Sequence, residues 1–567
     1  MNELNTDVLI IGSGGAGLFA ALRASSHPAA PEVKVMVKGS FGKSGCTRMV
    51  QGGFNAALQP DDSPVVHLRD TIVGGAFLNN QELARVLTED ARERVLELSN
   101  ELGVRFDRDA QGDSFDFKPF GGMSIDRTVH RGDLTGIEIV SRLADHVMSR
   151  PNVSILEEHR ALEVLHTPSG DRAAGILALD MRSGDFTVVK ARTVLIATGG
   201  GARMYRYSSP STEKSGDGIA MAFRAGVELM DMEMLQFHPT GLLAGDSILT
   251  GSVVEEGLRG AGGHLRNAVG ERFMSRYDPE RMERSTRDQV SRAIYWEVDE
   301  GRGTPQGGVY LDVSHLGADR IASEFPGMTQ RASLAGRDLT TEPIEVVPTG
   351  HFHMGGARID LDGNTAIEGL WIAGEDAGGV HGANRLGGNG VAESTVFGAR
   401  AGSSMAEAVT HNGMPEVDGG QVGAFIAVAE RRLGEPGKSA NPYRLRKRVE
   451  DAMWDGAGVI RDAAGLGRVL ETLESVESDL GGVQSAGSRA YNLMWNEALN
   501  LANIVVVARL LCISALARTE SRGAHFRSDY PEQNDDDWLR NVVLSPRDDG
   551  AIDTSTVLVE LTHLAPS

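Results

Sequence analysis

The stretch "DVLIIGSGGAG", residues 7 to 17, decides the fold, because it joins a buried-strand pattern directly to a glycine turn and a helix start. Gly12, Gly14 and Gly17 lie at this junction, where the lack of side chains lets the backbone approach a pyrophosphate group. The positive N-terminal end of the following helix favours the negative charge of that group. The stretch therefore predicts a Rossmann-like dinucleotide site.

The flanking sequence extends this unit into an open α/β sheet. A helix is expected over residues 15 to 25, and the "VKVMVK" run at 33 to 38 predicts the second strand. Two more buried strands end in glycine turns, "TVLIATGGG" at 193 to 201 and "GLWIAGED" at 369 to 376. The carboxyl ends of parallel strands converge on one crevice, so these three turns should meet at one ligand.

The remaining composition excludes several classes of protein. A chain of 567 residues predicts two to four domains, and its formal net charge of −22 disfavours nucleic acid. The two cysteines, Cys46 and Cys512, are too few for a disulfide framework, an iron–sulfur cluster or a zinc cage, so no metal site is expected. We also expect no signal peptide. The apolar run at 504 to 517 is expected to be too short to span a membrane, and predicts a buried helix.

Three regions are expected along the chain. The nucleotide-binding domain should be interrupted by a charged α+β insertion, and helical periodicity from Leu445 to Leu473 predicts a helical bundle after it. The predicted bounds are 1–240 and 351–420 for the nucleotide-binding domain, 241–350 for the insertion, 421–540 for the helical domain and 541–567 for a tail.

The acidic residue that normally ends the second strand of a dinucleotide-binding unit is replaced here by Lys38. A nicotinamide cofactor is therefore less well supported than FAD, whose ribose can be held elsewhere. Glu375, in the third glycine turn, is the candidate ribose ligand.

Four further motifs carry a resemblance to a known family. They are "QFHPTG", "TRDQVSRAI", "HFHMGG" and "HGANRLGGNGVAESTVFG". With them the chain resembles the flavoprotein subunits of succinate dehydrogenase and fumarate reductase, a family that includes L-aspartate oxidase, over residues 5 to 540. The resemblance implies an FAD-binding domain, a capping domain that closes on a dicarboxylate, and a C-terminal helical domain. The expected FAD contacts are Gly12, Gly14, Gly15, Ala16, Gly17, Lys38, Cys46, Thr47, Gln51, Gly52, Gly53, Thr198, Gly199, Gly200, Asp217, Glu375 and Asn389.

The same motifs supply groups suited to a small dicarboxylate. Arg385 can hold one carboxylate through two parallel hydrogen bonds, and His238 and His351 can donate further hydrogen bonds. The resemblance further implies that Phe120 packs against the substrate. It assigns proton delivery to Arg287 and its resupply to Glu256 and Arg259, while a hydride comes from flavin N5.

One departure from the family bears on the substrate. Glu255 stands where many relatives have a threonine that holds a substrate carboxylate, and a glutamate would repel that group unless protonated or turned away. The substrate could then be fumarate or succinate, aspartate, or a related acid with an amine or amide. The "DYPEQNDDDWLRN" tail favours the fumarate and succinate enzymes; L-aspartate oxidase is the first alternative, and a catalytically silent FAD-binding interaction module the second.

Cys46, in "SGCTRMVQGG", aligns with the histidine that links covalently to the flavin in many relatives. A thiolate could form such a link, but a buried cysteine is usually inert, so we expect noncovalent FAD. In this family that state favours fumarate reduction. The resemblance also implies a separate iron–sulfur subunit, and membrane anchor subunits through it. We expect a cytoplasmic location, at the membrane's inner face only through such partners.

Overall fold

The computed structural model describes residues 1–434, 441–547 and 549–566. Its largest sheet has seven strands in the order β6-β2-β1-β9-β8-β7, with β16 also pairing with β9. They are β1 (Asn2–Ile11), β2 (Val33–Met36), β6 (Val153–Leu156), β7 (His159–His166), β8 (Ala173–Asp180), β9 (Phe186–Ile196) and β16 (Leu370–Ile372). Strands β6, β2, β1, β9 and β16 run parallel, and β7 and β8 add an antiparallel extension.

The first glycine turn has the geometry that the sequence predicts. Helix α1 (Gly15–Ser25) begins directly after β1, and Gly12 has a φ of 113°. A Cβ atom on Gly12 would lie 2.2 Å from the carbonyl oxygen of Ala197, and one on Gly17 would lie 2.0 Å from that of Gly12. Only glycine allows strand, turn and helix to approach this closely.

Strand β9 is longer than the strand predicted at 193 to 201 and ends earlier. Its residues 186 to 190 pair with β8, and its residues 194 to 196 pair with β16. The extra length is needed because two strands share this edge. The glycines at 199 to 201 lie in the turn beyond it, at the carboxyl end of the sheet.

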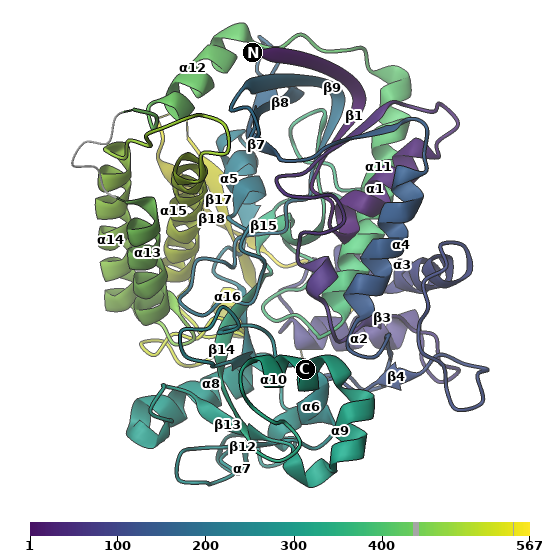
Figure 1. Cartoon of the computed structure of the whole chain (residues 1–567), viewed down its shortest axis with the longest axis vertical. Helices are drawn as coiled ribbons and strands as arrows, with labels where there is room; N and C mark the ends of the chain where they lie inside the picture. The colour runs from purple at the N-terminus through teal and green to yellow at the C-terminus, as the bar shows by residue number, and fades with distance from the viewer. Residues whose placement is uncertain (435–440, 548, 567) are drawn as a thin grey trace.

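Helices cover both faces of this sheet (Figure 1). Helices α1, α3, α4 and α11 pack on one face. Helix α5 packs on the other face, α15 packs on α5, and α13 and α14 pack on α15, in one continuous apolar core with the sheet. Their bounds are α2 (Pro64–Gly74), α3 (Gln81–Asn100), α4 (Thr135–Met148), α5 (Asp217–Arg224), α11 (Asn389–His411), α12 (Gly419–Glu430), α13 (Pro442–Ala457), α14 (Ala463–Gly481) and α15 (Leu493–Ala517).

The inserted α+β region lies at one end of the molecule, in teal in Figure 1. Its sheet has the order β11-β14-β13-β12, and its apolar core is built from residues between Leu242 and Val346. Its elements are β11 (Leu235–Leu242), α6 (Glu256–Gly260), β12 (His264–Arg266), α7 (Met274–Tyr277), α8 (Arg287–Glu297), β13 (Val309–Asp312), α9 (Ala318–Glu324), α10 (Pro326–Leu334) and β14 (Ile344–His353). We refer to it as the cap, and we propose 241–350 as its bounds.

The apolar run at 504 to 517 belongs to a longer helix than the sequence analysis expected. Helix α15 has 25 residues, and by length and composition alone it could cross a membrane. It nevertheless packs against α13, α14 and α5, and 67% of its most apolar window is buried. The run is thus part of a longer helix, and the predicted buried helix is observed.

The predicted tail is partly ordered into strands. Helix α16 (Asp535–Trp538) leads into β17 (Arg540–Pro546) and β18 (Ile552–Leu558), which form a sheet in the order β15-β10-β17-β18 with β10 (Leu229–Met230) and β15 (Gly356–Ala357). The buried side chains of Val542, Val543 and Leu544 anchor β17. Residues 540 to 546 are therefore anchored in the fold, and the bounds 541–567 for a tail stay a prediction.

Candidate active site

One continuous cavity, of about 260 Å³, runs from the first glycine turn to the cap. The predicted cofactor residues that line it are Gly12, Gly14, Gly15, Ala16, Lys38, Cys46, Thr47, Gln51, Gly52, Gly53, Thr198, Gly199, Asp217 and Glu375. The predicted substrate and catalytic residues that line it are Phe120, His238, Glu256, Arg287, His351 and Arg385. Segments far apart in the sequence therefore meet at one site.

Four predicted residues do not line the cavity. Gly17 and Gly200 lie behind it, and Arg259 lies behind Glu256. The Asn389 side chain is 0% exposed and bonds Asn55, His67 and Thr71. We therefore correct the expectation for Asn389: its side chain supports the start of α11 and does not face the cavity.

The glycine-rich end of the cavity has the space that a dinucleotide needs. Gly45 and Gly199 both have positive φ angles, and a Cβ atom on either would meet no other atom within 4 Å. The backbone N–H of Gly15 donates to Thr47 Oγ1 at 3.0 Å, which fixes the turn at the start of α1. An open wall beside a helix N-terminus suits a pyrophosphate group, so these residues fit the predicted FAD.

Lys38 is not a free substitute for the missing acidic residue. Its Nζ donates to Asp217 Oδ2 at 2.7 Å, and Arg160 binds the other oxygen of Asp217 at 2.8 Å. Against the effect of burial, Arg160 and Lys38 lower the pKa of Asp217. Asp217 therefore stays ionised and is shared by two cations, which leaves Lys38 engaged at this wall of the cavity.

Glu375 is also engaged by neighbours. It follows β16 in a short 3-10 turn, and its Oε1 accepts hydrogen bonds from the Lys214 ammonium and, at 2.9 Å, from the His353 backbone N–H. Burial raises the pKa of Glu375 to about 7, although Lys214 opposes the shift. Lys214 also lines the cavity and was not predicted, because nothing in its local sequence marks it.

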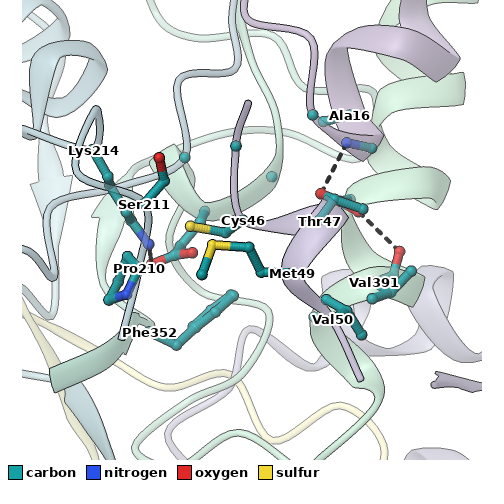
Figure 2. Close-up of a pocket in the computed structure, with 18 of the residues that line it drawn as sticks. Ala16, Cys46, Thr47, Met49, Val50, Pro210, Ser211, Lys214, Phe352 and Val391 are labelled. Carbon is teal, nitrogen blue, oxygen red and sulfur yellow. Dashed lines mark hydrogen bonds and ion pairs between the residues drawn. The ribbon is translucent and has the colours of Figure 1, made fainter. Parts of the chain in front are cut away.

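Cys46 lies on the cavity wall beside the Pro210–Lys214 segment (Figure 2). Burial raises the pKa of its thiol, although the neighbouring Lys214 opposes the shift. Both cysteines are free, and Cys512 is buried in α15. Because the nucleophilic form of cysteine is the thiolate, this environment makes Cys46 a poor nucleophile.

His238 and His351 project from the neighbouring antiparallel strands β11 and β14, and their ring centroids lie 5.3 Å apart. Burial, with the charge of Arg287, lowers the pKa of both well below the ordinary value, so both rings are neutral at pH 7. His238 Nδ1 accepts from the Thr240 backbone N–H at 3.3 Å, which leaves Nε2–H to donate. His351 Nδ1 lies 2.8 Å from Ser209 Oγ.

Arg385 is buried without a carboxylate partner among the described residues. Its Nη2 donates to Gln236 Oε1 at 3.3 Å, its guanidinium lies 4.3 Å from the Phe352 ring centroid, and its Nε has no partner. Burial and the nearby Arg287 lower the pKa of Arg385 to about 9. A buried cation in this state is stabilised by an anionic ligand.

Arg287 heads a chain of charged groups that leads away from the cavity. Its Nε donates to Glu256 Oε2 at 2.8 Å, and its Nη1 donates to Gln236 Oε1 at 3.0 Å. Glu256 Oε1 lies 3.5 Å from Arg259 Nη2, because the two residues are three apart on α6. Burial alone would raise the pKa of Glu256, but Arg287 and Arg259 lower it to about 2. Glu256 is therefore an ionised bridge between two arginines.

Gln236 was not predicted, although it contacts both Arg287 and Arg385. It lies two residues before His238 on β11, and alternation along a strand places both side chains on the same face. Its Nε2 also donates to the Arg385 carbonyl oxygen at 2.7 Å. The alternation within "QFHPTG" could have identified this residue.

Phe120 reaches the cavity because glycines make room for it. A Cβ atom on Gly52 would lie 2.4 Å from its ring, and one on Gly387 would lie 2.8 Å from it. Its side chain is 6% exposed. The ring thus lies between the predicted flavin segment and the segment that carries Arg385.

Two cap residues complete the far end of the cavity. Glu255 lines the wall and its Oε1 accepts from Lys118 Nζ at 2.7 Å. Arg331, from α10, donates to the Val253 carbonyl oxygen and, with the Gln51 amide turned to face it, to that amide oxygen at 2.7 Å. Lys118 and Arg331 were not predicted, since only the tertiary fold brings them here.

Comparisons with known proteins agree with this geometry. An FAD binding domain model matches residues 7–391, and a fumarate reductase flavoprotein C-terminal model matches residues 446–567. One subunit of the fumarate reductase (CoM/CoB) of Methanothermobacter marburgensis is 41% identical, with 95% of this chain and 97% of the relative covered. The succinate dehydrogenase flavoprotein subunit of Coxiella burnetii is 35% identical, with 95% and 94% covered.

Two further matches are to proteins named for different activities. L-aspartate oxidase 1 of Ralstonia nicotianae is 36% identical, with 93% of this chain and 96% of the relative covered. A solved structure of a variant of quinol fumarate reductase from E. coli superposes with a TM-score of 0.94 at 32% identity, with 100% of this chain and 99% of that chain covered.

Proposed function

This chain belongs to the succinate dehydrogenase and fumarate reductase flavoprotein family, and from that premise we propose that it interconverts fumarate and succinate. It is an FAD-dependent oxidoreductase of that type. The observation that carries the proposal is that two arginines line one cavity that begins at the glycine turn. Arg287 is bridged to Glu256, and Arg385 has no carboxylate partner among the described residues.

The binding groups suit an acid with two carboxylates. Arg385 would hold one carboxylate through two hydrogen bonds, aided by His351, and the free Nε2–H of His238 would donate to the second. Phe120 would pack against the carbon chain between them. Because His238, Arg385 and Phe120 are buried, these contacts would act in a medium of low dielectric constant.

Reduction of fumarate adds one hydride and one proton across the double bond. FAD, when bound, supplies the hydride chemistry. Arg287 would give the proton, since its guanidinium is held between Glu256 and Gln236 at the cavity wall. Because an arginine has a pKa above about 12, it can release a proton only if it is resupplied at once. A replacement proton would pass from Arg259 through the ionised Glu256 carboxylate to Arg287, and Arg259 would in turn be reprotonated from solvent.

We further propose that FAD is bound noncovalently and that the chain works in the direction of fumarate reduction. The raised pKa of Cys46 supports this, because a protonated thiol does not attack the flavin. Electrons would reach FAD from a separate iron–sulfur subunit, since two cysteines cannot hold a cluster in this chain. Any association with the membrane's inner face would then run through partner subunits.

L-aspartate oxidase is the second candidate, and Glu255 is the observation in its favour. A carboxylate on the cavity wall attracts an ammonium group, which aspartate carries and succinate lacks. Release of ammonia and peroxide from aspartate and oxygen by the isolated chain would establish this activity and contradict the first.

The experiment that tests the proposal is anaerobic reoxidation of the reduced, FAD-loaded protein by a panel of fumarate, oxaloacetate and iminosuccinate-generating mixtures. Fumarate should reoxidise the flavin fastest, with one succinate formed for each flavin oxidised. If no acid accelerates reoxidation, the chain is a silent FAD-binding module and the proposal is wrong.

A further inference from the structure

Glu255 creates an electrostatic problem in the cavity wall. It precedes α6, its side chain is 2% exposed, and its Oε2 is buried without a hydrogen-bond partner among the described residues. Burial raises the pKa of Glu255, as do the nearby carboxylates Asp133 and Glu256, whereas the Lys118 ammonium opposes the shift and favours the ionised form. An acid with two negative charges would therefore enter a cavity that already presents a carboxylate at its far end.

Lys118, from another part of the chain, forms an ion pair with Glu255. Its Nζ lies 2.7 Å from Glu255 Oε1 and also donates to the Gly132 carbonyl oxygen at 2.8 Å. The Lys118 side chain is 13% exposed, and it does not line the cavity itself. Arg287, the nearby cavity arginine, is already paired with Glu256. Among the described residues, Lys118 is therefore the cation that pairs with Glu255.

We propose that Lys118 is a positioning residue that makes the cavity accept a dianionic acid, by holding the Glu255 carboxylate and cancelling its charge. This inference rests on the proposed function, because it concerns the same cavity and the same class of substrate. In the place of a neutral threonine, the chain uses an ion pair with no net charge.

The pair also joins two separate segments of the fold. Lys118 belongs to β4 (Phe117–Lys118), which pairs with β5 (Thr128–Val129), and β5 pairs with β3 (Phe54–Asn55); Glu255 belongs to the cap. A second contact crosses the same boundary: Asp133 Oδ2 accepts from the Met328 backbone N–H at the start of α10, at 3.0 Å. Compensation of Glu255 therefore requires the cap to be seated on the β4–β5 segment.

The decisive variant is Lys118→Met in the FAD-loaded protein. It should raise the KM for fumarate and the Kd for succinate by about 10- to 100-fold, the order expected for one uncompensated like charge in a site of effective dielectric constant about 20. The kcat should change little, because Arg287 and Glu256 are untouched. Lys118→Arg, which keeps the cation, should stay near the parent values.

A second substitution distinguishes an effect of the Glu255 charge on binding from a loss of folding. The double variant Lys118→Met with Glu255→Gln removes both charges and should restore the KM and the Kd, whereas a simple loss of folding would not be rescued. Fumaric acid monoamide, which has one carboxylate fewer, should lose much less affinity in Lys118→Met than fumarate does.

Asp133→Ala is the matched control. It breaks the other contact across the same boundary, without leaving a carboxylate uncompensated at the cavity wall. It should leave the KM for fumarate within about twofold of the parent value, well below the effect expected for the loss of one charge partner. An equal rise of the KM for fumarate in Asp133→Ala and Lys118→Met would show that only the contact between the cap and the β4–β5 segment matters. That result would overturn the proposal.

Binding of succinate to the oxidised protein, followed by the flavin absorbance, keeps this test separate from turnover. Succinate binding that weakens in Lys118→Met and recovers in the double variant would support the role of Lys118, even if fumarate fails to reoxidise the flavin and the proposed function is lost. Unchanged binding in Lys118→Met, no recovery in the double variant, or no succinate binding by the parent would overturn it.

Discussion

Two buried groups of charges in this molecule differ in how their arginines are compensated. Beneath α15, Arg518 contacts three carboxylates: Glu233 at 2.6 Å, Glu520 at 3.0 Å and Asp231 at 3.3 Å. On the cavity, three arginines line the wall among the described residues, and only Arg287 has a carboxylate partner. Arg331 and Arg385 contact neutral acceptors alone.

The difference separates structural charges from charges that await a ligand. A buried cation without a counter-ion is costly, so a fold retains it only where something else supplies the negative charge. The Arg518 cluster is complete within the chain and ties the C-terminal region to the segment around β10. Among the described residues, Arg331 and Arg385 on the cavity have no carboxylate partner, an arrangement that suits an anionic ligand.

The largest effect is expected at Arg287, the cavity arginine that pairs with a carboxylate. Arg287→Lys keeps a cation beside Glu256 but changes the group that carries the proton. Turnover of fumarate with a reduced dye should fall by about 10²- to 10⁴-fold, the usual contribution of a general acid. Near-parent turnover would mean that another group delivers the proton.

The next largest effect is expected when the Arg518 cluster is broken. Arg518→Met leaves Glu233, Glu520 and Asp231 without their shared cation, and the free energy of unfolding should fall by about 3–5 kcal/mol. Denaturant titration of the FAD-loaded protein measures this change. A loss below about 1 kcal/mol would show that the cluster is as replaceable as a surface ion pair.

The smallest effect is expected for Cys46→Ser, on the cavity wall beside the Pro210–Lys214 segment. The flavin content, the KM for fumarate and the kcat should all stay within about twofold of the parent, because a protonated, buried thiol acts as a small side chain. Acid precipitation of the parent protein should leave the yellow colour in the supernatant. Colour retained in the pellet of the parent, and lost in Cys46→Ser, would instead identify a covalent link.

The sequence predicted the parts of this site that depend on local patterns. The strand–glycine–helix junction at residues 7 to 17 is such a pattern, since strand periodicity and the glycine turn are both set by neighbouring residues. Placement of α1 at Gly15–Ser25 followed from it. The motif residues His238, Arg287, His351 and Arg385 meet at one cavity, as expected from the resemblance.

The parts that were missed depend on pairings between distant segments. Lys118 lies in a two-residue strand that has no periodic signal, and its role is visible only once the cap brings Glu255 to it. Asn389 was misassigned because a motif places a residue in a segment but does not give the direction of its side chain. Strand β9 was given the wrong bounds because its length follows from two partner strands.

The most direct test of the central claim is thermal unfolding of the FAD-loaded parent and Arg385→Met, each with and without succinate. Without succinate the variant should unfold at a temperature no lower than the parent, because Arg385 has no carboxylate partner among the described residues and an uncompensated buried cation is costly. With succinate only the parent should shift upward. A variant that unfolds several degrees lower without succinate, or that keeps the full succinate-dependent shift, would contradict the account.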